Sequence, residues 1–135
     1  KSLLDMGCGT AILAILASMQ GADPILAIDI DEWAYDNAQE NIALNGTSNI
    51  RVKIGGAELL GGETFDIILA NINRNILLND IRHYVSVLNE GGILYMSGFY
   101  TEDIPAIEAE CKKYNLQLVY NGDLQNWAVV KFVKQ

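Results

Sequence analysis

The stretch LLDMGCGTAIL, Leu3 to Leu13, decides the fold of this chain. A short apolar run ends on an acid, Asp5, and a Gly-x-Gly turn follows at Gly7 and Gly9. An apolar helical pattern begins directly after the turn. A buried strand that turns sharply into a helix is typical of an α/β sheet, and its glycines let a ligand approach the backbone closely. The stretch therefore predicts a ligand site at the end of the first strand.

The composition indicates one domain without disorder, because half of the 135 residues are hydrophobic and only 19% are charged. The net charge of −8 argues against nucleic-acid binding through the domain's own electrostatics, and is more compatible with a basic partner. Cys8 and Cys111 lack C-x-x-C spacing, which fits a reduced, cytoplasmic protein without a metal site. No apolar run has the length of a membrane span and no signal peptide is recognisable, so we expect no membrane contact.

Strand and helix patterns alternate along the whole chain. The expected strands cover residues 2–6, 24–30, 49–55, 65–72, 92–99, 116–122 and 126–134. The expected helices cover residues 10–20, 31–46, 75–88 and 101–115. Apolar strands that alternate with helices predict a three-layer, Rossmann-like α/β fold with a mostly parallel seven-stranded sheet and helices on both faces. The short link between the last two strands predicts a C-terminal antiparallel hairpin.

Local signals place the ends and faces of the helices. Thr10 is the expected N-cap of the first helix, Asp31 caps the second, and Pro105 is tolerated in the first turn of the fourth. The segment Asn89 to Gly92 is expected to end the third helix. The apolar face expected for the second helix consists of Trp33, Ala34, Ala38, Ile42 and Leu44.

Ligands of open parallel sheets bind beyond the carboxyl ends of the strands, where this chain gathers glycine and polar residues. Asp29 follows Gly9 by 20 residues, close to the spacing of a ribose-binding acid. A dinucleotide fingerprint needs a third glycine, and Ile12 stands in its place. This weakens the interpretation as a nucleotide-dependent oxidoreductase, which stays an alternative.

The turn instead resembles the D-x-G-x-G motif of class I S-adenosylmethionine-dependent methyltransferases. The resemblance implies S-adenosylmethionine as cofactor, with the backbone of Gly7 and Gly9 passing close beneath it. It implies that Asp29 accepts hydrogen bonds from the ribose hydroxyls, with Ile30 beside it in the cofactor site. Asp5 is expected to orient the loop or to meet the ammonium group of the cofactor, directly or through water.

The sequence also resembles the ribosomal protein L11 methyltransferase family. The similarity rests on the G-C-G-T-x-I-L-A turn, the I-D-I-D-x-x-A segment, the E-N-x-x-x-N-G helix end, and the stretches FDIILANI and LNEGGILYMSG. It implies methyl transfer to amino groups, of lysine side chains and of the N-terminus, in ribosomal protein L11. Asn71 would then lie beside the methyl group and orient the acceptor amine. The family usually has glycine at the position of Ala11.

The resemblance also implies the domain organisation. Residues 1–135 correspond to the catalytic domain, without the N-terminal substrate-recognition domain of the family and without an upstream threonine that contacts the cofactor. We therefore expect the isolated chain to bind the cofactor weakly and to be a poor catalyst or inactive. Two alternatives stay open: a class I methyltransferase with another protein or small-molecule acceptor, and a non-catalytic cofactor-binding scaffold.

Five further side chains have weaker assignments. His83, the only histidine, is expected on the surface, and Trp33 is expected to pack rather than to stack on the cofactor. Glu58 either meets the amino group of the adenine or is a solvated loop charge. Cys8 contributes only its backbone to the turn, and Cys111 is expected to be a small core residue.

Overall fold

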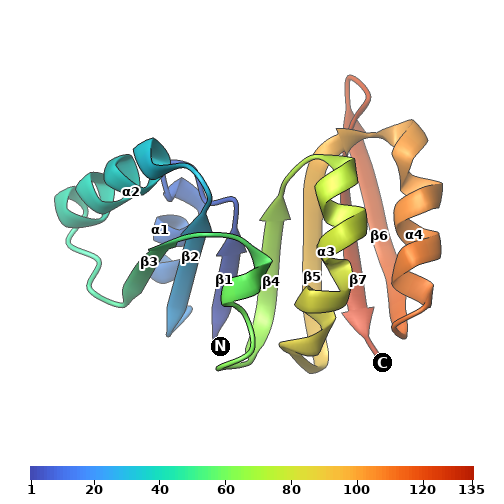
Figure 1. Ribbon diagram of the computed structural model, residues 1–135, viewed down its shortest axis with the longest axis horizontal. Coiled ribbons are helices and arrows are strands. Elements are labelled where there is room, and N and C mark those ends of the chain that lie inside the picture. The colour runs from blue at the N-terminus through green and yellow to red at the C-terminus, as the bar shows by residue number, and fades with distance from the viewer.

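The computed structural model describes residues 1–135 and shows one seven-stranded sheet between two layers of helices (Figure 1). The strand order is β3-β2-β1-β4-β5-β7-β6. The strands are β1 (Leu3–Met6), β2 (Ile25–Asp29), β3 (Ile50–Ile54), β4 (Phe65–Asn71), β5 (Leu88–Tyr100), β6 (Leu116–Leu124) and β7 (Trp127–Lys134). The helices are α1 (Ile12–Met19), α2 (Glu32–Leu44), α3 (Arg74–Ser86) and α4 (Ile104–Lys112), with short 3₁₀ turns η1 (Ala57–Leu59) and η2 (Thr101–Asp103).

The pairing of the strands confirms the predicted fold. Strands β1 to β5 pair in parallel, and β7 runs antiparallel to both β5 and β6. The hairpin turn between β6 and β7 consists of Gln125 and Asn126, which both have a positive φ, as two-residue hairpin loops of this kind require. None of the four helices has the length and apolar character needed to cross a membrane.

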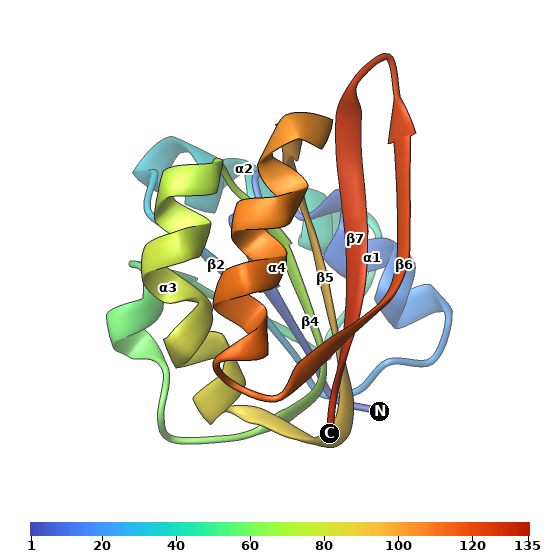
Figure 2. The same cartoon turned by 90° about the vertical axis from the view of Figure 1, so that its right-hand side faces the viewer.

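The two faces of the sheet carry two separate apolar clusters. Helices α3 and α4 cover the face turned to the viewer in Figure 1, α1 lies behind the strands, and α2 lies at the upper left beside β2 and β3, packed in the same cluster as α1 (Figures 1 and 2). Leu3 belongs to the cluster of 10 buried residues under α1 and α2, and Leu4 to the cluster of 23 under α3 and α4. This separation follows from the alternation of side chains along a strand.

The start of α1 differs from the prediction that Thr10 caps this helix. Thr10 is exposed, and Ala11 is the residue that precedes the helix, without a side-chain cap. Ala11 has a φ of 67°, in the left-handed region, and its N–H donates to the carbonyl of Cys8 at 2.8 Å. The tight reversal after the glycines is therefore closed by backbone hydrogen bonding, which a propensity argument for Thr10 does not detect.

Helix α2 begins as predicted, because a side-chain oxygen of Asp31 accepts a hydrogen bond from the backbone N–H of Trp33 at 2.9 Å. The predicted apolar face is only partly correct. Ala38 and Ile42 are buried, but Trp33 and Leu44 are 76% and 77% exposed. At 100° per residue, Trp33 and Leu44 lie on the side of the helix opposite to Ile42.

Strand β5 begins earlier than predicted. The segment Asn89 to Gly92 does not end a helix but belongs to β5, which starts at Leu88 opposite Phe65 of β4. Helix α3 already ends at Ser86, and its N-cap Asn73 accepts from the N–H of Ile76 at 3.1 Å. Glycine in this segment therefore accompanies an irregular strand start, a role that the sequence pattern does not distinguish from a helix stop.

Candidate functional site

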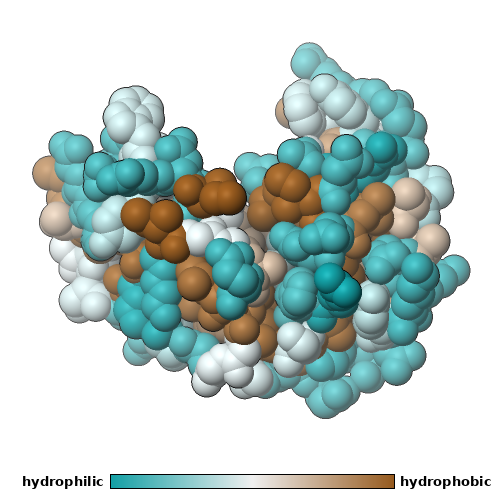
Figure 3. All heavy atoms as spheres, in the orientation of Figure 1, coloured by the Kyte–Doolittle hydropathy of each residue, from teal (hydrophilic) through white to brown (hydrophobic).

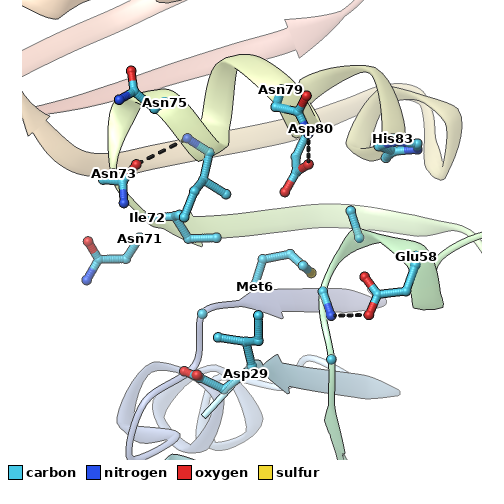
Figure 4. A pocket seen from close by; sticks show the side chains of 16 residues that line it. Met6, Asp29, Glu58, Asn71, Ile72, Asn73, Asn75, Asn79, Asp80 and His83 are labelled. Carbon is cyan, nitrogen blue, oxygen red and sulfur yellow. Dashed lines mark hydrogen bonds between the residues drawn. The ribbon is translucent and has the colours of Figure 1, made fainter.

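A cavity of about 900 Å³ opens at the carboxyl ends of β1, β2 and β4, between η1 and α3 (Figure 4). Four of the predicted site residues line it: Gly7, Asp29, Ile30 and Asn71. Asp5 and Gly9, which were also predicted to bind the cofactor, are not among its lining residues. The strand ends therefore bring most of the predicted site residues together, as expected for an open parallel sheet.

The turn after β1 is anchored on β2 and has room only for glycine at its first corner. The N–H groups of Gly7 and Cys8 both donate to the carbonyl of Ile28, at 2.8 and 3.0 Å. Gly7 has a φ of 74°, and a Cβ atom there would lie 2.9 Å from Cγ1 of Ile72. Gly9 has a φ of 55°, and a Cβ there would meet no atom within 4 Å. Gly7 thus keeps the backbone close to the end of β4 and the cavity open.

The carboxylate of Asp29 joins the turn to the end of β2. Its Oδ2 accepts a hydrogen bond from the N–H of Gly9 at 2.9 Å, and its Oδ1 accepts from the N–H of Asp31 at 3.0 Å. Each carboxylate oxygen has a second acceptor position, so Asp29 can still receive donors from the cavity that it lines. The same side chain therefore shapes the turn and offers a fixed acceptor pair to a ligand.

Asp5 is a buried acid without a partner. It is 1% exposed, and neither of its carboxylate oxygens has a hydrogen-bond partner within the chain. Burial, followed by the nearby charge of Asp29, raises the pKa of Asp5 to about 7. Burial and the same two acids raise the pKa of Cys8 to about 12, so its thiol stays protonated. A buried acid of this kind stabilises the site only when a donor or a cation meets it.

The end of β4 is packed tightly against β5. The hydroxyl of Ser97 donates to Oδ1 of Asn71 at 3.3 Å, and the N–H of Ile72 donates to the carbonyl of Ser97 at 3.0 Å. Gly98 has a φ of 96°, and a Cβ there would lie 2.7 Å from the carbonyl oxygen of Ile72. These contacts fix the amide of Asn71 at the mouth of the cavity.

The cavity also contains side chains that sequence reasoning left open or missed. Glu58 lines it and accepts from the N–H of Gly56 at 2.9 Å; this hydrogen bond lowers the pKa of Glu58 and keeps it ionised. His83 is half-buried and lines the cavity, a position that the expectation of a surface residue did not specify. Ile76, Asp80 and His83 share one face of α3, and this spacing of four and three residues was the available signal.

Two other expectations concern residues away from the cavity. Cys111 is fully buried in the larger cluster, as predicted for a small core residue. Trp33 does not line the cavity, and it does not pack in either cluster. Its exposed ring therefore needs an explanation other than the packing that we expected.

Comparison with known proteins adds independent evidence. The whole chain, residues 1–135, matches the family model of ribosomal protein L11 methyltransferase (PrmA). Curated ribosomal protein L11 methyltransferases of Bacteroides fragilis and Phocaeicola vulgatus are 58% and 54% identical to it over 134 residues. Each of these alignments covers 98% of this chain and 48% of the relative, so the chain spans about half the length of these relatives.

Solved structures agree with the sequence comparison. The ribosomal protein L11 methylase of Lactobacillus delbrueckii subsp. bulgaricus superposes with a TM-score of 0.93 and 33% identity, over 99% of this chain and 70% of that one. A methyltransferase of Pyrococcus furiosus, at 22% identity and a TM-score of 0.85 over 98% of this chain and 74% of that one, shares the fold. The chain belongs to the ribosomal protein L11 methyltransferase family, a class I family whose methyl donor is S-adenosylmethionine.

Proposed function

We propose that residues 1–135 form the catalytic domain of a protein methyltransferase that modifies amino groups of ribosomal protein L11. The observation that carries the proposal is the convergence of the Gly7 turn, Asp29 and Asn71 on one cavity. Because the matched relatives are about twice as long, the proposal assigns only cofactor binding and methyl transfer to these residues. A ribosomal protein as substrate would place the reaction in the cytoplasm.

The residues around the cavity fit S-adenosylmethionine. Asp29 offers two carboxylate oxygens for the ribose hydroxyls, and Ile30, which is 81% exposed, offers an apolar side chain for the base. The ionised Glu58 is a suitable acceptor for the amino group of the adenine. The unpartnered carboxylate of Asp5 would gain a partner from the ammonium group, directly or through water. When bound, the cofactor supplies an electrophilic methyl group on a sulfonium.

The chain's contribution to methyl transfer is to position the acceptor. A lysine amine must be neutral to act as a nucleophile, and partial desolvation at the cavity mouth lowers its pKa. Oδ1 of Asn71, held by Ser97, and the carbonyl of Ile72 can accept the N–H groups of that amine. The ammonium releases its proton to solvent before transfer, so no dedicated general base is required, and fixed alignment with exclusion of water then promotes attack on the methyl group.

The test is methyl transfer from labelled S-adenosylmethionine to ribosomal protein L11 of Bacteroides fragilis, at saturating cofactor and over long incubations because we expect the isolated chain to turn over slowly, with the modified residues located by mass spectrometry. We expect label on lysine side chains or on the N-terminal amine. Asn71→Ala should lower kcat about tenfold to a hundredfold, because misplacement of the amine affects the chemical step. Gln39→Ala, which removes an exposed amide on α2, is the control. Label on another acceptor only, or equal rates for Asn71→Ala, would contradict the proposal.

A further inference from the structure

An exposed pair of aromatic rings lies where the end of β5 meets the tip of the β6–β7 hairpin. The ring centroids of Tyr100 and Trp127 are 4.6 Å apart with an interplanar angle of 31°. The two residues form the last pair between β5 and β7, and they are 43% and 53% exposed. The hairpin extends past the ends of the neighbouring helices (Figures 1 and 2). The rings therefore stand at the ligand edge of the sheet without a covering element.

The surroundings of this pair are acidic. We define the hairpin tip as residues 100–103 and 121–128; it contains Glu102, Asp103 and Asp123 but no lysine, arginine or histidine. Asp103 is paired with Arg74 of α3 at 3.1 Å, whereas neither Glu102 nor Asp123 takes part in an ion pair. The side-chain amide of Asn126, which precedes Trp127, donates to Oε2 of Glu102 at 3.5 Å and links this carboxylate to the hairpin turn.

The hairpin tip is connected to the cavity through short links. Asn71 lies opposite Ser97 in the β4–β5 register, and Tyr100 follows Ser97 by three residues, or about 10 Å of strand. Asp103, which binds Arg74, also accepts a hydrogen bond from the N–H of Tyr100 at 3.1 Å. The molecule is hollowed between the α2 side and the hairpin side, so one elongated segment can reach both places (Figure 3).

We propose that the hairpin tip docks a second lysine of the protein substrate, with its ammonium over the Tyr100–Trp127 pair and beside Glu102. This inference rests on the proposed function, because it takes the substrate to be a protein with amino-group acceptors. Aromatic faces attract ammonium groups, and a fixed carboxylate adds the counter-charge. At about 3.3 Å per residue, the docked lysine lies about three residues from the acceptor along an extended segment.

Trp33 supplies a contrast within the same chain. It is 76% exposed and lies next to Asp31 and Glu32 on α2, so it combines an exposed ring with acids. A side-chain oxygen of Asp31 is engaged as the helix cap, however, and Trp33 has no aromatic partner. Since Trp33 and Trp127 are the only tryptophans, their indole N–H signals report the two places separately.

The test is a nuclear magnetic resonance titration of the chain with a nine-residue peptide of alternating glycine and lysine. The indole N–H signal of Trp127 should shift and saturate, while that of Trp33 moves little. The same peptide with acetylated lysines should not shift Trp127, because acetylation removes the ammonium charge. Equal, non-saturating shifts at both tryptophans, or no shift at Trp127, would overturn the inference.

Two variants assign the binding to the rings and the acid. Trp127→Leu and Glu102→Gln should each weaken peptide binding about threefold to thirtyfold. Because Trp127→Leu lacks the indole signal, its peptide affinity is measured from the backbone amide signal of Glu102. Trp33→Leu, which removes the other exposed tryptophan ring, on α2 and outside the tip, should leave peptide binding unchanged. Undiminished binding in both tip variants would refute the assignment. The titration needs no turnover, so failed methylation of ribosomal protein L11 would count against the proposed function alone.

Discussion

The molecule has two contrasting regions: the corner between β1 and β2, and the end of the sheet formed by β5, β7 and β6. They differ in backbone conformation and in the polarity of their buried side chains. At the corner, Asp5 is buried without a partner, and Gly7, Gly9 and Ala11 all have left-handed backbone conformations. At the other end, long strands place fully buried apolar side chains such as Phe132 in the larger cluster. The first region contains the candidate site, and the second contains most of the packing.

The contrast shows which region contains unfavourable local conformations and which region stabilises the fold. Left-handed residues and unpartnered buried charges are unfavourable, and they persist only where surrounding structure holds them in place. In this chain the surrounding structure is the continuous sheet, which carries the corner on β1 and β2. Substitutions at the two regions should therefore separate global stability from binding.

The largest effect on stability is expected in the packed end. Phe132→Ala removes a fully buried ring from β7 and should lower the free energy of unfolding by about 3–5 kcal/mol. Urea unfolding measures this change. Val129→Ala, on the same strand but 37% exposed, is the matched control and should cost about 0.5 kcal/mol. Similar losses for both variants would show that this end is not the packed region.

Asp5→Asn should change how stability depends on pH. The pKa of Asp5 is about 7 in the folded chain, against the ordinary 3.8 of an exposed aspartate, so the folded state holds the extra proton between these pH values. The free energy of unfolding therefore falls as the pH rises from about 4 to about 7. Asp5→Asn removes this pH-dependent loss of stability. The variant should therefore be more stable than the wild type at pH 8, by up to about 4 kcal/mol.

Thermal unfolding at pH 5 and pH 8 tests the role of Asp5. The variant should gain stability relative to the wild type mainly at pH 8. Asp123→Asn, which removes an exposed acid at the hairpin tip, should leave the pH dependence unchanged. An identical pH dependence in the wild type and Asp5→Asn would mean that Asp5 is not held protonated.

Ala11→Gly is expected to have the smallest effect. Relief of the left-handed strain, about 1–2 kcal/mol, is offset by the lost methyl contact and by the entropy of glycine. The free energy of unfolding should stay within about 1 kcal/mol of the wild type. Ala14→Gly, at an equally buried helical position of α1, should cost clearly more. Equal costs for the two variants in urea unfolding would show that Ala11 is not strained.

The same contrast explains how much could be predicted from sequence. Apolar runs and turn signals predicted the sheet and the hairpin, and the glycine turn and the spacing of Asp29 predicted two of the residues that line the cavity, because these signals are local; Ile30 and Asn71 were predicted through the family resemblance. The cap at Asp31 was also predicted correctly, since capping depends on a few adjacent residues. The position of the hairpin next to β5 depends on sheet order, which no short motif encodes.

The errors arose where residue type alone was followed and the detailed backbone geometry or the packing decided otherwise. Thr10 is a good capping residue, but the backbone of Ala11 closes the turn. His83 lines the cavity together with Ile76 and Asp80 of α3, and the sequence pattern does not place α3 relative to the cavity. Trp33 and Leu44 looked like packing residues by type, although their helical positions face solvent.

The most direct test of the central claim is calorimetric titration of S-adenosylhomocysteine into the wild-type chain and Asp29→Ala. Asp29 accepts a hydrogen bond from Gly9 of the turn and also lines the cavity. Asp29→Ala therefore removes a charged hydrogen-bond acceptor that a bound ligand would use. Asp36→Ala, which removes an exposed acid from α2, is the control. We predict an affinity about tenfold to a hundredfold lower for Asp29→Ala, with an unchanged circular dichroism spectrum. Equal affinity in the folded Asp29→Ala variant would contradict the assignment of the cofactor site.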